Sequence, residues 1–191
     1  MKEINFRAYR VFETEEGRIE RKIVRRKVSD LPDNDVLVKV HYASLNYKDA
    51  LSCSGNKGVT RSYPHTPGID CAGEVVADRS RTFKPGDHVN VAGDDLGMNT
   101  DGGFGEYIKV PPQWIMKLPE DISLRESMMV GATGFTAGLS VNKLLFMGQN
   151  PEDGPIVVTG AAGGVGSIAV LILKKLGFEV VAATSNIEDS R

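Results

Sequence analysis

The stretch that decides the fold is 157-VVTGAAGGVGSIAV-170, an apolar run that breaks into glycines and then resumes as small and branched apolar residues. The overlapping "PIVVTG" predicts a short buried strand, and "GSIAVLILKKLG" predicts a helix that stops at Gly177. The next apolar run, "FEVVAATS", predicts a second strand. Strand, glycine turn, helix and strand make a βαβ unit, whose strands should be parallel with a right-handed crossover.

The glycine turn has the pattern G-x-x-G-x-x-G. In a dinucleotide site such glycines permit a tight turn, close approach of the backbone to the pyrophosphate, and close packing of helix on strand. The pyrophosphate would rest on the helix N-terminus, where free N–H groups and the helix dipole favour an anion. A plain turn is the alternative, but the flanking strand and helix favour a dinucleotide. The residues predicted to bind it are Gly160, Ala162, Gly163, Gly164, Val165 and Gly166.

The residues after the second strand bear on the choice of cofactor. An Asp or Glu there would accept a hydrogen bond from the adenosine ribose 2′-hydroxyl and would repel a 2′-phosphate. This sequence has Thr184, Ser185 and Asn186 instead, which are neutral hydrogen-bonding residues. They favour NADPH over NADH, and an ordinary polar turn is the alternative reading.

Composition argues against several classes of partner. A net charge of −2 and a pI near 6.0 provide no basic footprint for nucleic acid or for an anionic membrane. The basic segment 18-RIERKIVRRK-27 is interleaved with apolar residues and predicts a solvated strand face. No run approaches the roughly 18 apolar residues of a membrane span, and no apolar signal segment opens the chain, so a cytoplasmic protein is expected. The two cysteines lack CxxC spacing, which argues against a disulfide framework or a cysteine-built zinc site.

The first 120 residues predict many short strands, because β-branched runs alternate with Gly, Pro and Asp. Pro85 and Gly86 in "FKPGDHV" predict a tight hairpin turn, and "YKDALSCSG" predicts a short helix. The expected strands lie at 36–40, 73–77, 88–93 and 105–111. This part of the chain is therefore expected to be all-β.

Helical signals follow. Ser123 and Glu126 form an S-x-x-E capping box, and Thr133 can cap a second helix. The change of composition places the domain boundary near residue 122, which gives domains 1–122 and 123–191.

Several further motifs stand in one order with the glycine turn: "SLNYKDAL", "PHTPGIDCAGEV", "FKPGDHV" and "GGFGEYIKVP". Through essentially all 191 residues the chain resembles the medium-chain dehydrogenase/reductase superfamily, and within it the zinc-free quinone oxidoreductase branch that includes bacterial NADPH-dependent acrylyl-CoA reductases. The resemblance implies an α/β protein with an all-β part: a GroES-like β-barrel over 1–122 and the first βαβ of a Rossmann-type NADP-binding domain over 123–191. It also implies a homodimer for the complete protein.

The resemblance also bears on metal chemistry. In the zinc alcohol dehydrogenases of this superfamily, a Cys and a His ligand occupy the positions of Asn46 and Ile69. An isoleucine has no donor atom, and zinc prefers thiolate, imidazole and carboxylate to an amide. Asp70 remains as a single carboxylate, which does not make a site. No metal is expected.

The reaction that remains is hydride transfer from NADPH to an activated double bond, which requires a group that stabilises the developing enolate. By the resemblance, Tyr47 lies at the cofactor and is the first candidate; Asn46 would position a carbonyl, and Asp70 would orient Tyr47 or the nicotinamide ribose. Thr133 would lie near the nicotinamide. Structural roles are the alternatives: an Asx turn for Asn46, packing for Tyr47, and caps for Asp70 and Thr133. The expected substrate is a small molecule, acrylyl-CoA or a similar enoyl thioester, with a quinone as the alternative.

The family's chains continue well beyond residue 191, and a nucleotide-binding half needs a βαβαβ unit. The predicted sheet is therefore open, with an unpaired apolar edge. Weak or no activity is expected of this polypeptide alone, and a cofactor-binding protein without turnover is the second alternative.

Overall fold

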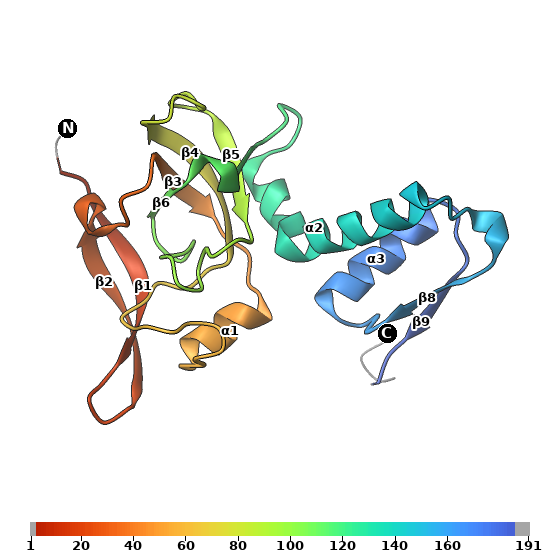
Figure 1. Ribbon diagram of the computed structural model, residues 1–191, viewed down its shortest axis with the longest axis horizontal. Helices are drawn as coiled ribbons and strands as arrows, with labels where there is room; N and C mark the ends of the chain where they lie inside the picture. Colours follow the sequence, from red (N-terminus) through yellow and green to blue (C-terminus); the bar gives the residue numbers. More distant parts are fainter. Residues whose placement is uncertain (1–2, 186–191) are drawn as a thin grey trace. The chain divides into compact units, whose positions relative to one another are not determined.

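The computed structural model describes residues 3–185 of the chain (Figure 1). The chain divides into two compact units on either side of the Ala132–Thr133 bond. Within the described range, no helix combines the length and apolar character needed to cross a membrane.

The first unit is built on a five-stranded antiparallel sheet with the order β6-β3-β4-β5-β7. Its strands are β3 (Val36–Tyr42), β4 (Asp70–Asp78), β5 (His88–Ala92), β6 (Tyr107–Val110) and β7 (Ile115–Lys117). The four strands predicted between residues 36 and 111 all occur. The hairpin predicted at Pro85 and Gly86 joins β4 to β5, and Gly86 takes the left-handed φ of 92° that the turn requires.

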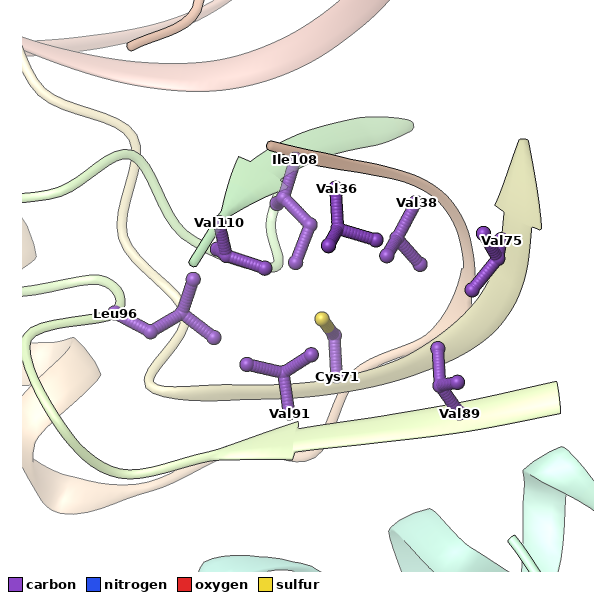
Figure 2. Packing of buried hydrophobic residues seen from close by; sticks show 9 residues of the cluster. All are labelled: Val36, Val38, Cys71, Val75, Val89, Val91, Leu96, Ile108 and Val110. Atoms are coloured by element: carbon purple, nitrogen blue, oxygen red, sulfur yellow. The ribbon is translucent and has the colours of Figure 1, made fainter. Parts of the chain in front are cut away.

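Side chains from four of these strands meet in one core (Figure 2). The cluster comprises Val36, Val38, Cys71, Val75, Val89, Val91, Leu96, Ile108 and Val110. Burying such a side chain stabilises the fold by about 1.5–3 kcal/mol, so this cluster is the main source of stability for the sheet.

A two-stranded antiparallel ribbon, β1 (Asn5–Glu13) with β2 (Ile19–Lys27), packs on the same unit. Phe6 and Ala8 of β1 form a second buried cluster with Leu31 and Leu37. Leu37 is therefore buried, although it alternates along β3 with the core residues Val36 and Val38 and so lies on the opposite face of the strand. The cause is long-range packing: the ribbon covers the face of β3 that strict alternation of buried and exposed residues would leave to solvent.

Short 3₁₀ turns occur at Val28–Asp30, Pro112–Trp114 and Pro151–Asp153.

Two helices complete this part of the chain. The predicted short helix is α1 (Tyr47–Cys53), and α2 runs from Leu124 to Phe146 with a break at Gly131, where φ is 53° and ψ is −166°. The capping box is confirmed, since Ser123 Oγ accepts the Glu126 N–H at 3.2 Å and Glu126 Oε2 accepts the Ser123 N–H at 3.0 Å. The break lies two residues before Thr133, at a glycine with a conformation that other residues rarely adopt.

The start of α2 is attached to the sheet, because Asn90 Nδ2 donates to Ser127 Oγ at 2.6 Å. Because the start of α2 is attached to the sheet, the first compact unit extends to Ala132. The amino-acid composition, in contrast, changes near residue 122, where the sequence had predicted the domain boundary.

The second unit contains the predicted βαβ: β8 (Ile156–Thr159), α3 (Gly164–Lys175) and β9 (Val180–Ala183). The two strands pair in parallel, and Gly177, with φ of 88°, follows the end of α3 as predicted. The C-terminal half of α2 packs against α3 and Phe178 in a shared core made of Ala137, Val141, Ala169, Leu173 and Phe178. This fold confirms the start of a Rossmann-type domain.

Candidate functional site

The glycine turn between β8 and α3 depends on two of its glycines. Gly160 has a left-handed φ of 61° and accepts the Gly163 N–H at 2.9 Å, which closes the turn. At Gly166 an added Cβ would lie 2.2 Å from the Gly160 carbonyl oxygen. Only glycine at position 166 lets the first turn of α3 pack this closely on the turn before it.

The N-terminus of α3 presents backbone amides to solvent. Gly163 is the N-cap, and Ala162, Gly164 and Val165 are exposed beside it. The first turn carries no acidic side chain, while Lys174 and Lys175 lie in the last turn. Free amides and the helix dipole therefore favour an anion at this end of α3.

The end of β9 lies beside the same turn. The Ala161 N–H donates to the Ala183 carbonyl at 3.1 Å, which brings Thr184 and Ser185 next to the glycine residues. Thr184 is half-buried and Ser185 is exposed. Asn186 lies outside the described residues. The structure therefore brings two neutral hydroxyl side chains beside the glycine turn, and their role in binding a cofactor stays a prediction.

Thr133 also reaches this turn. An added Cβ on Gly164 would lie 3.1 Å from Thr133 Cγ2, so Thr133 packs against the first turn of α3. The predicted cofactor residues of the second unit, apart from Asn186, thus lie around one turn.

In the first unit, Asp70 is fully buried and forms a hydrogen-bond centre. Its Oδ1 accepts the Ser44 N–H at 3.1 Å, and its Oδ2 accepts the Ser44 hydroxyl at 2.6 Å and the Ala132 N–H at 2.8 Å. Charge-assisted bonds of this kind are what make a buried carboxylate tolerable. Asp70 therefore holds the break in α2 against the segment that leads into α1.

Asn46 connects to this centre through Ser44, since its Nδ2 donates to Ser44 Oγ at 3.1 Å. Asn46 is also the N-cap of α1. Ser44 had not been singled out from the sequence, because a lone serine after a strand carries no local signal for a contact with a residue 26 positions away.

Asp49 is a second buried carboxylate that sequence reasoning missed. It accepts the Asn46 N–H at 2.8 Å and the Ile69 N–H at 2.9 Å. Burial raises the pKa of Asp49, and the two backbone hydrogen bonds oppose that rise. Asp49 fixes α1 to the residue before Asp70, so Asn46 and Asp70 are held in one rigid segment.

Tyr47 takes the first position of α1 and is 79% exposed. Across residues 3–185 no hydrogen bond joins Tyr47 to Asp70, so the structure brings Asp70 to Ser44 and Asn46 and leaves the Tyr47 ring in solvent. The chemical roles of Tyr47, Asn46 and Asp70 stay predictions. Among the described residues, no three His, Cys, Asp or Glu side chains gather as metal ligands.

Comparison with known proteins places this geometry in a family. Residues 32–120 match the alcohol dehydrogenase GroES-like domain. The structure superposes on the YhdH oxidoreductase of Salmonella enterica, solved in complex with NADP, with a TM-score of 0.91 and 41% identity over 96% of this chain and 56% of that one. The chain belongs to the medium-chain dehydrogenase/reductase superfamily.

Other members of this superfamily are similar over most of the chain. The acrylyl-CoA reductase AcuI of Ruegeria pomeroyi is 43% identical over 91% of this chain and 53% of its own length. The Bacillus subtilis protein YhfP, solved with NAD bound, superposes with a TM-score of 0.91 at 42% identity over 98% of this chain and 56% of its own. The chain spans about half the length of the curated relatives it matches.

Proposed function

We propose that the protein carrying this chain is a zinc-independent oxidoreductase that uses NADPH to reduce the activated C=C bond of an enoyl thioester such as acrylyl-CoA. The observation that carries the proposal is the turn at Gly160–Gly166, with Thr184 and Ser185 beside it and no carboxylate at the described end of β9. Similarity to AcuI, and to YhdH structures solved with NADP or NADPH, supports it. The structure of YhfP was solved with NAD bound, so NADH is the competing cofactor in the titration below.

The residues present fit a phosphorylated dinucleotide. The backbone amides of Gly164 and Val165 would hold the pyrophosphate, while the Gly163 amide closes the turn on Gly160. The hydroxyls of Thr184 and Ser185 would donate to the 2′-phosphate. When bound, the reduced nicotinamide supplies a hydride for the β-carbon of the substrate.

The first unit would then stabilise the charge that this step creates. Hydride addition leaves an enolate on the thioester oxygen, and a positioned donor lowers the barrier to that charge. The exposed Tyr47 phenol is the donor we propose, with the Asn46 amide as a second contact held in place through Ser44. Asp70, fully buried, would act as a positioning residue.

Two alternatives have observations in their favour. Several similar relatives are named quinone oxidoreductases, one of them the human protein at 30% identity, so a quinone is the alternative substrate. The second alternative is a cofactor-binding polypeptide without turnover, and the exposed first turn of α3 with its glycine residues is the observation in its favour. We also propose that the protein carrying this chain is a homodimer and is located in the cytoplasm.

Fluorescence titration of this chain with NADPH and with NADH tests the cofactor. Tighter binding of NADPH is expected, and tighter binding of NADH would refute that part of the proposal. Oxidation of NADPH with acrylyl-CoA, followed by absorbance on the complete polypeptide that carries this sequence, tests the reaction. Turnover should fall sharply in Tyr47→Phe, and unchanged turnover would remove Tyr47 from the chemistry.

A further inference from the structure

The β1–β2 ribbon has two chemically different faces. Alternate residues of a strand point to opposite sides, so Arg21, Ile23 and Arg25 share one face of β2. The other face is partly covered: Arg26 is 9% exposed in an ion pair with Asp101 at 2.6 Å, and Lys22 lies over the Phe12 ring at 4.6 Å. On the first face Ile23 is 71% exposed between two exposed arginines.

Ile23, from this first face, and its strand partner Tyr9 line a groove of about 370 Å³ that lies wholly within the first unit. His41 and Tyr42, at the end of β3, line it as well, and Tyr42 is 45% exposed. The groove therefore combines an aliphatic side chain with two tyrosines that water can reach, a surface suited to a planar ring.

The two charged side chains that line the groove, Arg7 and Glu106, form an ion pair. Arg7 and Glu106 cancel each other, because the Arg7 guanidinium donates twice to Glu106 Oε1, at 2.9 and 2.7 Å. Arg21 and Arg25 do not line the groove but lie on either side of Ile23, which does, and neither makes an ion pair within the described part of the chain. Two guanidinium groups thus remain free to bind a phosphate, which they recognise with two parallel donors.

We propose that this groove binds a phosphorylated adenosine, and specifically the 3′-phosphoadenosine end of a coenzyme A thioester. The adenine would lie on Ile23 and Tyr42, with the phosphates at Arg21 and Arg25. The inference rests on the proposed function for its substrate class. The position suits such a substrate, because the groove is lined by Ala43, four residues before Tyr47, and a flexible pantetheine arm separates the nucleotide of coenzyme A from its acyl group.

The test is a calorimetric titration of the 191-residue chain with adenosine 3′,5′-bisphosphate. The double variant Arg21→Glu/Arg25→Glu should weaken binding by about 30-fold or more, since it replaces two charge-assisted donors by repelling charges. Lys22→Glu is the control: it makes the same charge reversal at a single position of the same strand, on the opposite face, and it should shift the affinity by about twofold or less. No binding to the unaltered chain, or equal losses in the control and the double variant, would overturn the proposal.

The 2′-phosphoadenosine of NADPH shares the same chemistry, so a second arm separates the two sources. Titrations with adenosine 2′,5′-bisphosphate and NADPH should be unchanged by the double variant. A parallel loss of NADPH affinity would assign the groove to the cofactor and overturn the substrate assignment. In turnover assays the double variant should raise KM for acrylyl-CoA and leave KM for acrylyl-pantetheine unchanged. If the protein shows no turnover but still binds the 3′,5′-bisphosphate in a way that depends on the two arginines, the two proposals separate. The proposed function is then refuted, and the groove is supported as a phosphoadenosine site.

Discussion

Gly166→Ala is the most direct test of the glycine turn. The added methyl carbon would lie 2.2 Å from the Gly160 carbonyl oxygen and 2.8 Å from the Gly160 carbonyl carbon. Both atoms are backbone, so neither can rotate away, and ordinary contact begins near 3.4 Å. The first turn of α3 must therefore move by about 1 Å, and overpacking of this kind costs about 1–3 kcal/mol.

The displaced amides are those proposed to hold the pyrophosphate. We expect the free energy of unfolding to fall by about 2–3 kcal/mol. NADPH affinity should fall by about 10- to 100-fold, which corresponds to about 1.4–2.8 kcal/mol. Urea denaturation followed by circular dichroism measures the first effect, and fluorescence titration of the folded variant measures the second.

Gly138→Ala in α2 provides the control, because an added Cβ there has no neighbour within 4 Å. Alanine is the better helix former, so this variant should be stabilised by up to about 1 kcal/mol and should bind NADPH unchanged. If Gly166→Ala binds NADPH as tightly as the unaltered chain, close packing at Gly166 does not affect cofactor binding. That result would refute the proposed role of the glycine turn.

Three further predictions concern the first unit. Asp70→Asn removes the charge from three buried hydrogen bonds and should lower the free energy of unfolding by about 2–3 kcal/mol. Ser44→Ala, the comparison variant, should lower it by about 1 kcal/mol. Equal effects of the two variants in urea denaturation would contradict the central role of Asp70. Burial lowers the pKa of His65 below its usual value of roughly 6.5. The unfolded chain therefore binds the proton first, and stability should be complete above that value and decrease as pH falls through it towards the lower folded pKa. His65→Gln should flatten this dependence, and an unaltered pH profile in the variant would exclude His65 as its source. Burial also raises the pKa of the fully buried Cys71 thiol, so an aromatic disulfide reagent should modify only the half-buried Cys53 in the native protein, and prompt modification of both thiols would contradict the burial of Cys71.

Local patterns explain why part of this structure could be predicted. The βαβ unit follows from contiguous apolar runs around a glycine turn, and the hairpin at Gly86 follows from two adjacent turn residues. The capping box at Ser123 and Glu126 involves residues three apart. Each of these features is decided within a few residues, so the sequence alone carried enough information to predict it.

The same local reasoning predicted which residues of the glycine turn would surround an anion. It also identified Thr184 and Ser185, because strands of a parallel sheet end at the same edge. A resemblance to a family, rather than periodicity, pointed to Tyr47 and Thr133.

The arrangement around Asp70 depended on the tertiary structure. Asp70 bonds to Ser44, 26 residues earlier, and to Ala132, 62 residues later, and no pattern in the sequence links these positions. The burial of Leu37 likewise follows from the β1–β2 ribbon lying on β3. The groove beside the arginines of β2 forms only because the end of β3 comes to lie near Tyr9 and Ile23. Short-range chemistry determined the elements and the glycine turn, while the long-range closure of the chain decided which polar groups are buried and which remain free to bind a ligand.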